Sequence, residues 1–198
     1  CVAAGRASDG VPGKRRGADP IGRALTALVA ALDSTGAPWM CIGGIAVIAH
    51  GVRRTTTDID AVVLGSAVSP DALIAAAARR GIVPRIDDAL AFARRNLVLL
   101  LRHRPTRVDL DVSLGWSPFE VAALDARAAT RFGHTTAPMA TPRDLVVLKA
   151  VAGRGKDVDD AVSLLTLYPD IDVRKVRREV ERLAALADAP QLLEPLDR

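Results

Sequence analysis

The chain has 198 residues, and its 27 Lys and Arg against 23 Asp and Glu give a net charge of +4. This length allows one globular domain, and 49% hydrophobic with 25% charged residues excludes a wholly disordered chain. No apolar run approaches the roughly 18 residues of a membrane span. The two cysteines provide no disulfide framework. We therefore expect a cytoplasmic protein without a membrane partner.

The N-terminal part alternates between helix and strand signals. Residues 1–19 are rich in glycine and basic side chains, and we expect a flexible leader or a remnant of cloning there. Apolar residues at spacings of three and four follow, and glycines separate the next elements. The predicted elements are a helix from Pro20 that ends before Gly36, a strand over Trp39–Ile42, a Gly43-Gly44 turn and a helical turn over 45–50.

The middle of the chain contains mostly strand signals. Apolar runs rich in valine and leucine predict strands, and an alanine-rich run that begins with proline predicts a helix. The predicted elements are a strand over Asp58–Leu64, a helix over Pro70–Arg80 and strands over Asn96–Arg102 and Arg107–Val112, joined by a turn at 104–106.

Only helices are predicted after Thr141, over 142–152, 157–167 and 173–187. Strands mixed with helices, followed by helices alone, indicate the α+β class. We expect a small mixed β-sheet flanked by helices in residues 20–140. Residues 141–198 are expected to form a helical C-terminal region packed on this core.

Pairs of aspartates separated by one residue are the main chemical signal. The chain has four such pairs: Asp58/Asp60, Asp109/Asp111, Asp157/Asp159 and Asp170/Asp172. The first two lie in apolar strands, where both carboxylates of a pair point to one face and a buried charge needs a partner. The other two lie at predicted helix starts, where acids are expected as caps. If the two strands are neighbours, their carboxylates converge, and such oxygen ligands select Mg²⁺ or Mn²⁺ and favour phosphate chemistry.

A possible phosphate-binding segment precedes the first pair. The Gly43-Gly44 turn lets backbone N–H groups approach an anion. Arg53 and Arg54 follow closely and could neutralise a triphosphate. The segment therefore predicts a nucleotide site beside the carboxylates.

These motifs, taken in order, resemble the nucleotidyltransferase superfamily. Ile42-Gly43-Gly44, Asp58-Ile59-Asp60 and Val108-Asp109-Leu110 follow the superfamily pattern of a glycine turn, an acidic pair and a later single carboxylate. With Thr141-Pro142-Arg143-Asp144-Leu145, Lys149 and the run from Arg154 to Asp160, the string is similar to the AbiEii-type branch of toxins and their relatives. The match covers roughly 21–167. It implies a polymerase-β-like minimal fold that uses a nucleoside triphosphate and Mg²⁺.

The resemblance also implies residue roles. Gly43 and Gly44 would hold the triphosphate, and Asp58 and Asp60 would bind the metal. Asp109 would be the third carboxylate and help to deprotonate the acceptor hydroxyl, with Asp111 on the same strand face as its rival.

Two residues of the later segment complete the implied site. Lys149 would contact the nucleotide phosphates. Asp157 would orient Lys149 or the nucleotide. Without such roles, Lys149 would be a lysine whose stem packs on the core, and Asp157 would belong to an acidic helix start.

The expected function is Mg²⁺- or Mn²⁺-dependent transfer of a nucleoside monophosphate to an acceptor hydroxyl. As the toxin resemblance implies, the favoured acceptor is the 3′ end of tRNA, and a cognate antitoxin protein is a possible partner. Two alternatives stay open. One is transfer to a protein or to a small molecule such as an aminoglycoside. The other is a non-catalytic nucleotide-binding or antitoxin-like module.

Overall fold

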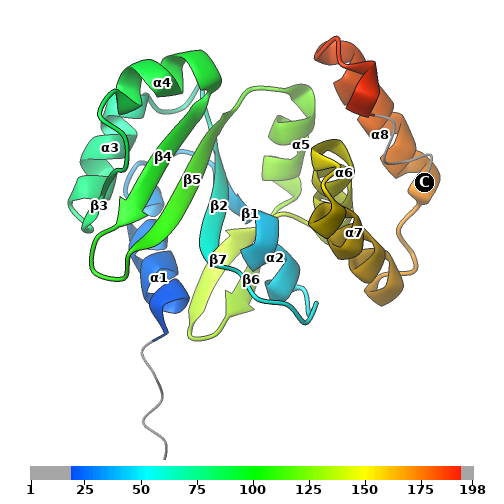
Figure 1. Ribbon diagram of the computed structural model, residues 1–198, viewed down its shortest axis with the longest axis horizontal. Helices are drawn as coiled ribbons and strands as arrows, with labels where there is room; N and C mark the ends of the chain where they lie inside the picture. The colour runs from blue at the N-terminus through cyan, green and yellow to red at the C-terminus, as the bar shows by residue number, and fades with distance from the viewer. Residues whose placement is uncertain (1–18, 193–198) are drawn as a thin grey trace, which may run out of the picture.

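A computed structural model gives the structure of the chain and describes residues 19–192. One seven-stranded mixed sheet, in the order β3-β4-β5-β2-β1-β7-β6, forms the centre of the molecule. Figure 1 shows α1 behind this sheet, α2 in front of it, and α6, α7 and α8 together at one side. The strands are β1 (Trp39–Ile42), β2 (Asp58–Leu64), β3 (Ile82–Pro84), β4 (Val98–His103), β5 (Val108–Gly115), β6 (Ala128–Phe132) and β7 (Thr135–Met139). The helices are α1 (Pro20–Asp33), α2 (Gly43–Ala49), α3 (Pro70–Ala78), α4 (Ala89–Asn96), α5 (Pro118–Ala126), α6 (Pro142–Ala152), α7 (Gly155–Leu167) and α8 (Val173–Leu186).

The central strand β2 pairs with β1 on one side and with β5 on the other. Its alternate residues Ile59, Ala61 and Val63 are fully buried, as expected for a strand in the middle of a sheet. The β2–β5 pairing is parallel and places Asp58 opposite Asp109 and Asp60 opposite Asp111. All four carboxylates therefore belong to one face of the sheet.

The segment after β7 brings further charges to this face. The Thr141 side chain caps α6 by accepting a hydrogen bond from the Asp144 N–H at 3.2 Å. The helix ends at Gly153 in the left-handed conformation, with φ 64°. The chain then turns into α7, which packs against α6. Lys149 near the end of α6 is thereby placed beside the start of α7.

Several predicted elements are confirmed. The strands over Trp39–Ile42 and Asp58–Leu64 have the predicted bounds, and the hairpin strands and the three late helices occur within a few residues of the prediction. The α+β class is also confirmed, as a mixed sheet flanked by helices. The predicted leader lies outside the described residues except for Asp19, whose side chain caps α1 by accepting from Gly22 N–H at 2.9 Å.

The structure differs from the prediction in three respects. The glycine pair forms the first turn of α2 rather than a turn before it. The sheet also has more strands than expected. β3, β6 and β7 were not predicted, because their strand signals in the sequence are weak. β3 has only three residues, β6 is mostly exposed, and β7 contains Pro138. The short helices α4 and α5 were also not predicted.

Candidate active site

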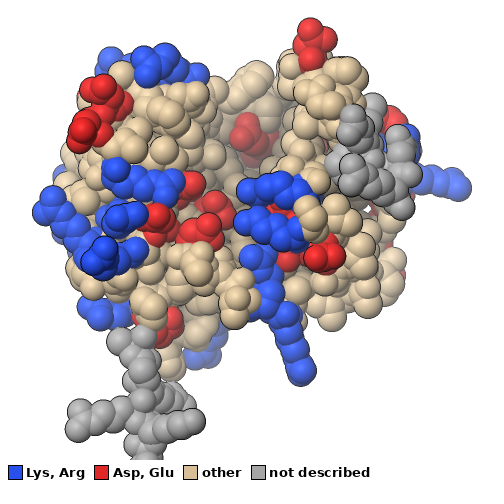
Figure 2. Space-filling view, viewed as in Figure 1, with Lys and Arg blue, Asp and Glu red and all other residues tan. Residues whose placement is uncertain are grey.

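A cavity of about 250 Å³ lies where β2 and β5 meet α2, α6 and α7. In Figure 2, acidic side chains lie in the middle of one face, with basic side chains on two sides of them. The cavity is lined by glycines, carboxylates and cations from five elements and their loops. The charged lining residues are Arg54, Asp58, Asp60, Asp111, Lys149, Arg154, Lys156 and Asp157.

Three of the cavity's carboxylates come from the sheet: Asp58 and Asp60 of β2 and Asp111 of β5. Burial, and then the negative charges of Asp58 and Asp111, raise the pKa of Asp60 to about 6. Burial also raises the pKa of Asp111, with Asp58 and Asp109 contributing and Arg85 opposing. The surrounding cations, Lys149 and Lys156 near Asp60 and Arg85 near Asp111, therefore compensate the negative charge here only in part.

Asp109, the predicted third carboxylate, has a different environment from Asp111. Its two oxygens accept from Arg102 at 2.5 and 3.1 Å and from Arg85 at 2.9 Å. These contacts, led by the hydrogen bond from Arg102, hold the pKa of Asp109 below its ordinary value. Arg85 also donates to Asp111 at 2.6 Å and so connects the two carboxylates. The residues that line the cavity include Asp111 and not Asp109.

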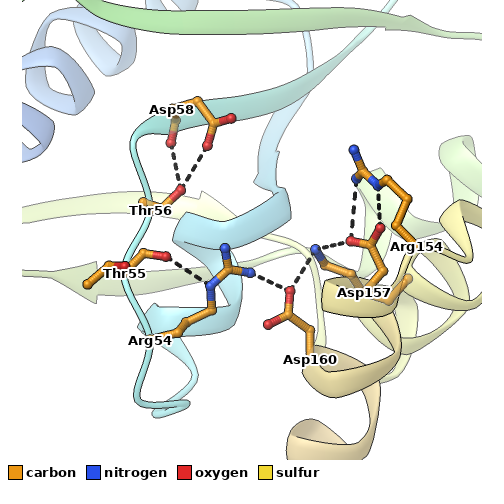
Figure 3. Close-up of polar contacts among 8 residues, drawn as sticks. Arg54, Thr55, Thr56, Asp58, Arg154, Asp157 and Asp160 are labelled. Atoms are coloured by element: carbon orange, nitrogen blue, oxygen red, sulfur yellow. Dashed lines mark hydrogen bonds and ion pairs between the residues drawn. The ribbon is translucent and has the colours of Figure 1, made fainter.

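Gly43 allows α2 to begin directly against Asp60. Its φ is +61°, and a Cβ at this position would lie 1.9 Å from Oδ2 of Asp60. Gly44 is similarly restricted, because its Cβ would lie 2.7 Å from Oγ1 of Thr56. Thr56 in turn donates to Asp58 Oδ1 at 2.9 Å (Figure 3). Only glycines fit where the backbone approaches the acidic pair this closely.

Lys149 connects α6 to two aspartates of α7. Its side chain is 8% exposed, and Nζ lies 2.8 Å from both Asp157 Oδ1 and Asp160 Oδ2. Asp157 is fully buried and also accepts from Arg154 Nε at 2.5 Å. Burial alone would raise the pKa of Asp157, but hydrogen bonds from Arg154 and Lys149 outweigh burial and lower it.

The same network extends to the loop that precedes β2. Arg54 donates to Asp160 and, through Nε, to the Thr55 carbonyl at 3.0 Å. Figure 3 shows Asp160 pointing toward Arg54, and Asp157 toward Arg154. The loop after α2 and the helix α7 are thus held together beside the cavity.

The structure brings most, but not all, of the predicted site residues to the cavity. Gly43, Gly44, Arg54, Asp58, Asp60, Lys149 and Asp157 line the cavity. Arg53 is exposed and is not among the lining residues.

Sequence reasoning missed Arg85 and the role of Asp160. The three-residue spacing between Asp157 and Asp160 places both on one helix face and could have indicated the second partner of Lys149. Arg85 had no such signal, because it reaches the carboxylates from the segment after β3.

The donor chemistry of the three cavity carboxylates fits a hard divalent cation. They supply only oxygen ligands, and a bound Mg²⁺ or Mn²⁺ would reduce the electrostatic repulsion between them. Within residues 19–192, however, no three or more His, Cys, Asp or Glu side chains are already arranged around a common metal position. The fit is therefore in charge and ligand type rather than in a preformed coordination shell.

None of the helices in residues 19–192 combines the length and the apolar character that crossing a bilayer requires.

The fold is similar to those of several solved structures, one of which is described as nucleotidyltransferase-like. The solution structure of the antibiotic-resistance factor ANT(2″)-Ia matches with a TM-score of 0.62 and 18% identity, over 86% of this chain and 97% of that one. The crystal structure of ANT(2″)-Ia with adenylyl-2″-tobramycin gives a TM-score of 0.58 and 18% identity, over 83% and 96% of the two chains. An antigenic nucleotidyltransferase-like protein from Paracoccidioides brasiliensis gives 0.53 and 16%, over 88% and 91%.

The nucleotidyltransferase-like fold expected from the motifs is thereby confirmed. No family model matches the chain, and no curated protein matches its sequence significantly. The AbiEii-type branch stays a prediction.

Proposed function

We propose that the protein is a metal-dependent nucleotidyltransferase that transfers a nucleoside monophosphate from a triphosphate to an acceptor hydroxyl. The observation that carries this proposal is one cavity that combines three carboxylates of the sheet with a cluster of cations. A triphosphate carries negative charge that the cations neutralise. The carboxylates supply the opposite function, because they can hold a cation and accept a proton.

Asp58, Asp60 and Asp111 would hold Mg²⁺ or Mn²⁺ in this proposal. When bound, the cation neutralises charge on the triphosphate and on the leaving group. Asp111 is preferred to Asp109 as the third carboxylate, because Asp111 lines the cavity and both oxygens of Asp109 contact arginines. Asp109 then acts as an anchor for Arg85 and Arg102.

The transfer step balances as an in-line displacement. The acceptor oxygen forms a bond to the α-phosphorus, and the bond from that phosphorus to the oxygen bridging to the β-phosphate breaks. Pyrophosphate leaves with the bond's electron pair. The proton of the acceptor hydroxyl passes to a carboxylate oxygen of Asp111.

The triphosphate would lie along the start of α2 and the end of α6. Backbone N–H groups of Gly43 and Gly44 can approach its oxygens, because neither residue carries a side chain. Lys149, Arg154 and Lys156 line the same cavity and supply positive charge. Asp157 fixes Lys149 for this task through its 2.8 Å ion pair.

The favoured acceptor is the 3′ end of tRNA, and a cognate antitoxin protein remains part of the proposal. Basic side chains surround the carboxylates: Arg54 and Arg154 line the cavity, and Arg85 and Arg102 contact Asp109. This distribution suits a polyanionic acceptor, whose phosphates contact arginine and lysine.

An aminoglycoside acceptor is the second candidate, and the fold similarity to ANT(2″)-Ia favours it. A polycationic aminoglycoside would have to approach between the two groups of basic side chains. A protein hydroxyl or a non-catalytic nucleotide-binding role are the remaining alternatives.

The test is to incubate the protein with Mg²⁺, total RNA and each α-³²P-labelled nucleoside triphosphate, beside Asp58→Ala. We expect a labelled product of tRNA size that requires Asp58. Equal labelling by Asp58→Ala would contradict the proposal. Growth arrest on expression would agree with an RNA acceptor, whereas aminoglycoside resistance would favour the second candidate.

A further inference from the structure

A second, apolar cavity adjoins the catalytic cavity. It has a volume of about 230 Å³ and lies between the start of α5, the second half of α6 and the end of α8. Leu148 of α6 lines both cavities. The apolar part of its lining is formed by Trp116, Phe119, Leu148, Val151, Leu183 and Leu186. A molecule that occupied both cavities would therefore have charged residues around one end and apolar residues around the other, with Leu148 between them.

Trp116 is the one exposed aromatic side chain among residues 19–192, with 59% of its surface accessible. It directly follows β5, the strand that carries Asp111. Its backbone N–H donates to Glu120 Oε2 at 3.0 Å, as does the N–H of Ser117 at 2.9 Å. These bonds fix the backbone where α5 begins, while the indole remains open to solvent. An immobilised backbone with an exposed ring is suited to stacking against a ligand.

The chemistry of the two cavities matches the two ends of a nucleotide. The catalytic cavity is rich in charge and fits phosphates, whereas the second offers an indole and aliphatic side chains to a flat heterocycle. Their volumes, about 250 and 230 Å³, are each below the range of roughly 300–1,000 Å³ typical of small-molecule sites, and together they fall within it. An exposed apolar surface beside a catalytic cavity also indicates a ligand-binding role.

We propose that Trp116 and this apolar cavity bind a nucleobase of a substrate whose reacting atoms lie at the acidic site. The proposal rests on the nucleotidyltransferase function and extends it to a base-binding subsite. The base belongs either to the donor triphosphate or to the 3′-terminal nucleotide of an RNA acceptor. Both present the same stackable ring, and the experiment distinguishes them.

The donor arm uses the fluorescence of Trp116, because Trp39 is 3% exposed and contributes a constant background. The full chain is titrated, with Mg²⁺, with each nucleoside triphosphate and with inorganic tripolyphosphate, which lacks a base. If the donor base stacks, triphosphates quench the emission and tripolyphosphate does not. In calorimetry, Trp116→Ala should then bind the triphosphates roughly 5- to 150-fold more weakly, since stacking on an aromatic ring contributes about 1–3 kcal/mol per base. Trp116→Phe should recover most of this loss.

The acceptor arm uses a short RNA and the same RNA with an abasic 3′-terminal residue. If the acceptor base stacks, Trp116→Ala weakens binding of the first RNA by a similar factor and leaves binding of the abasic RNA unchanged. Val162→Ala is the matched control, because Val162 is 58% exposed on α7 and lies outside both cavities. It should bind every ligand as the parent does.

Two outcomes separate this inference from the proposed function. If Trp116→Ala binds triphosphates and both RNAs like the parent, and the parent still transfers nucleotides, the base-binding subsite is overturned and the function stands. If the parent binds neither tripolyphosphate nor any triphosphate, the proposed function itself fails. Circular dichroism of each variant confirms that it is folded.

Discussion

At the scale of single residues, the two aspartates of β5 are expected to differ. Asp111 lines the cavity, whereas Asp109 is held by Arg85 and Arg102. We expect Asp111→Asn to lower kcat by about 10²- to 10⁴-fold, the typical contribution of a positioned acid or base. Asp109→Asn should lower it by less than roughly tenfold on the same scale. Equal losses in steady-state kinetics would contradict the assignment.

The raised pKa of Asp60 predicts a pH dependence of stability. Its value of about 6 in the folded protein exceeds the ordinary 3.8, so the folded state binds more protons between these values. The free energy of unfolding therefore loses a contribution from Asp60 as the pH rises from about 4 to 6. The loss is at most about 3 kcal/mol. In urea unfolding, Asp60→Asn should gain stability relative to the parent as the pH rises, and a constant difference would refute this.

At the scale of elements, the start of α2 depends on Gly43. Gly43→Ala meets two penalties, the positive φ and the collision of its Cβ with Asp60. Gly36→Ala is a matched control, because Gly36 has φ +71° and nothing within 4 Å of its Cβ position. Both should lose about 1–2 kcal/mol of stability from the left-handed backbone. Only Gly43→Ala should also displace Asp60 and abolish nucleotide transfer, so retained transfer in this variant would contradict the account.

The contact between α6 and α7 depends on Asp157. Asp157→Ala leaves Lys149 in a buried environment with one carboxylate fewer and removes the partner of Arg154. Breaking a buried charge pair costs about 3–5 kcal/mol. Asp159→Ala, on the exposed side of the same helix, should change stability by less than about 0.5 kcal/mol. Similar urea midpoints for the two variants would show that the network adds no stability.

At the scale of the whole molecule, the sequence predicts the strands that carry the site better than the periphery. Asp58–Leu64 is recognisable because its buried residues are isoleucine, alanine and valine, a pattern typical of a central strand. β6 is an edge strand and β7 is its neighbour, and both are partly exposed, so the local sequence pattern carries little information about them.

Prediction of the candidate site from the sequence is limited in the same way. The glycine pair, Asp58, Asp60 and Lys149 stand out in the sequence because their residue types conflict with their apolar surroundings. The choice between Asp109 and Asp111 could not be made there, because both lie on one face of β5. It depends on Arg85, which reaches β5 only through the tertiary fold.

Cation binding should stabilise the whole protein through the same carboxylates. At a Mg²⁺ concentration 100 times its Kd, binding to the folded state alone adds about 2.7 kcal/mol. We expect Tm to rise with Mg²⁺ in the parent at pH 7.5 and to change little in Asp58→Asn/Asp60→Asn. An equal rise in the double variant would place the cation elsewhere.

Whether this cavity transfers a nucleoside monophosphate can be read from the position of a radioactive label. Each nucleoside triphosphate is labelled with ³²P at either the α- or the γ-phosphate. It is then supplied with Mg²⁺ and total RNA. We predict that the α label enters the product, that the γ label leaves in pyrophosphate, and that Asp60→Asn abolishes transfer. Transfer of the γ label would show a kinase instead, and α-labelling that persists in Asp60→Asn would show that this cavity does not catalyse the reaction.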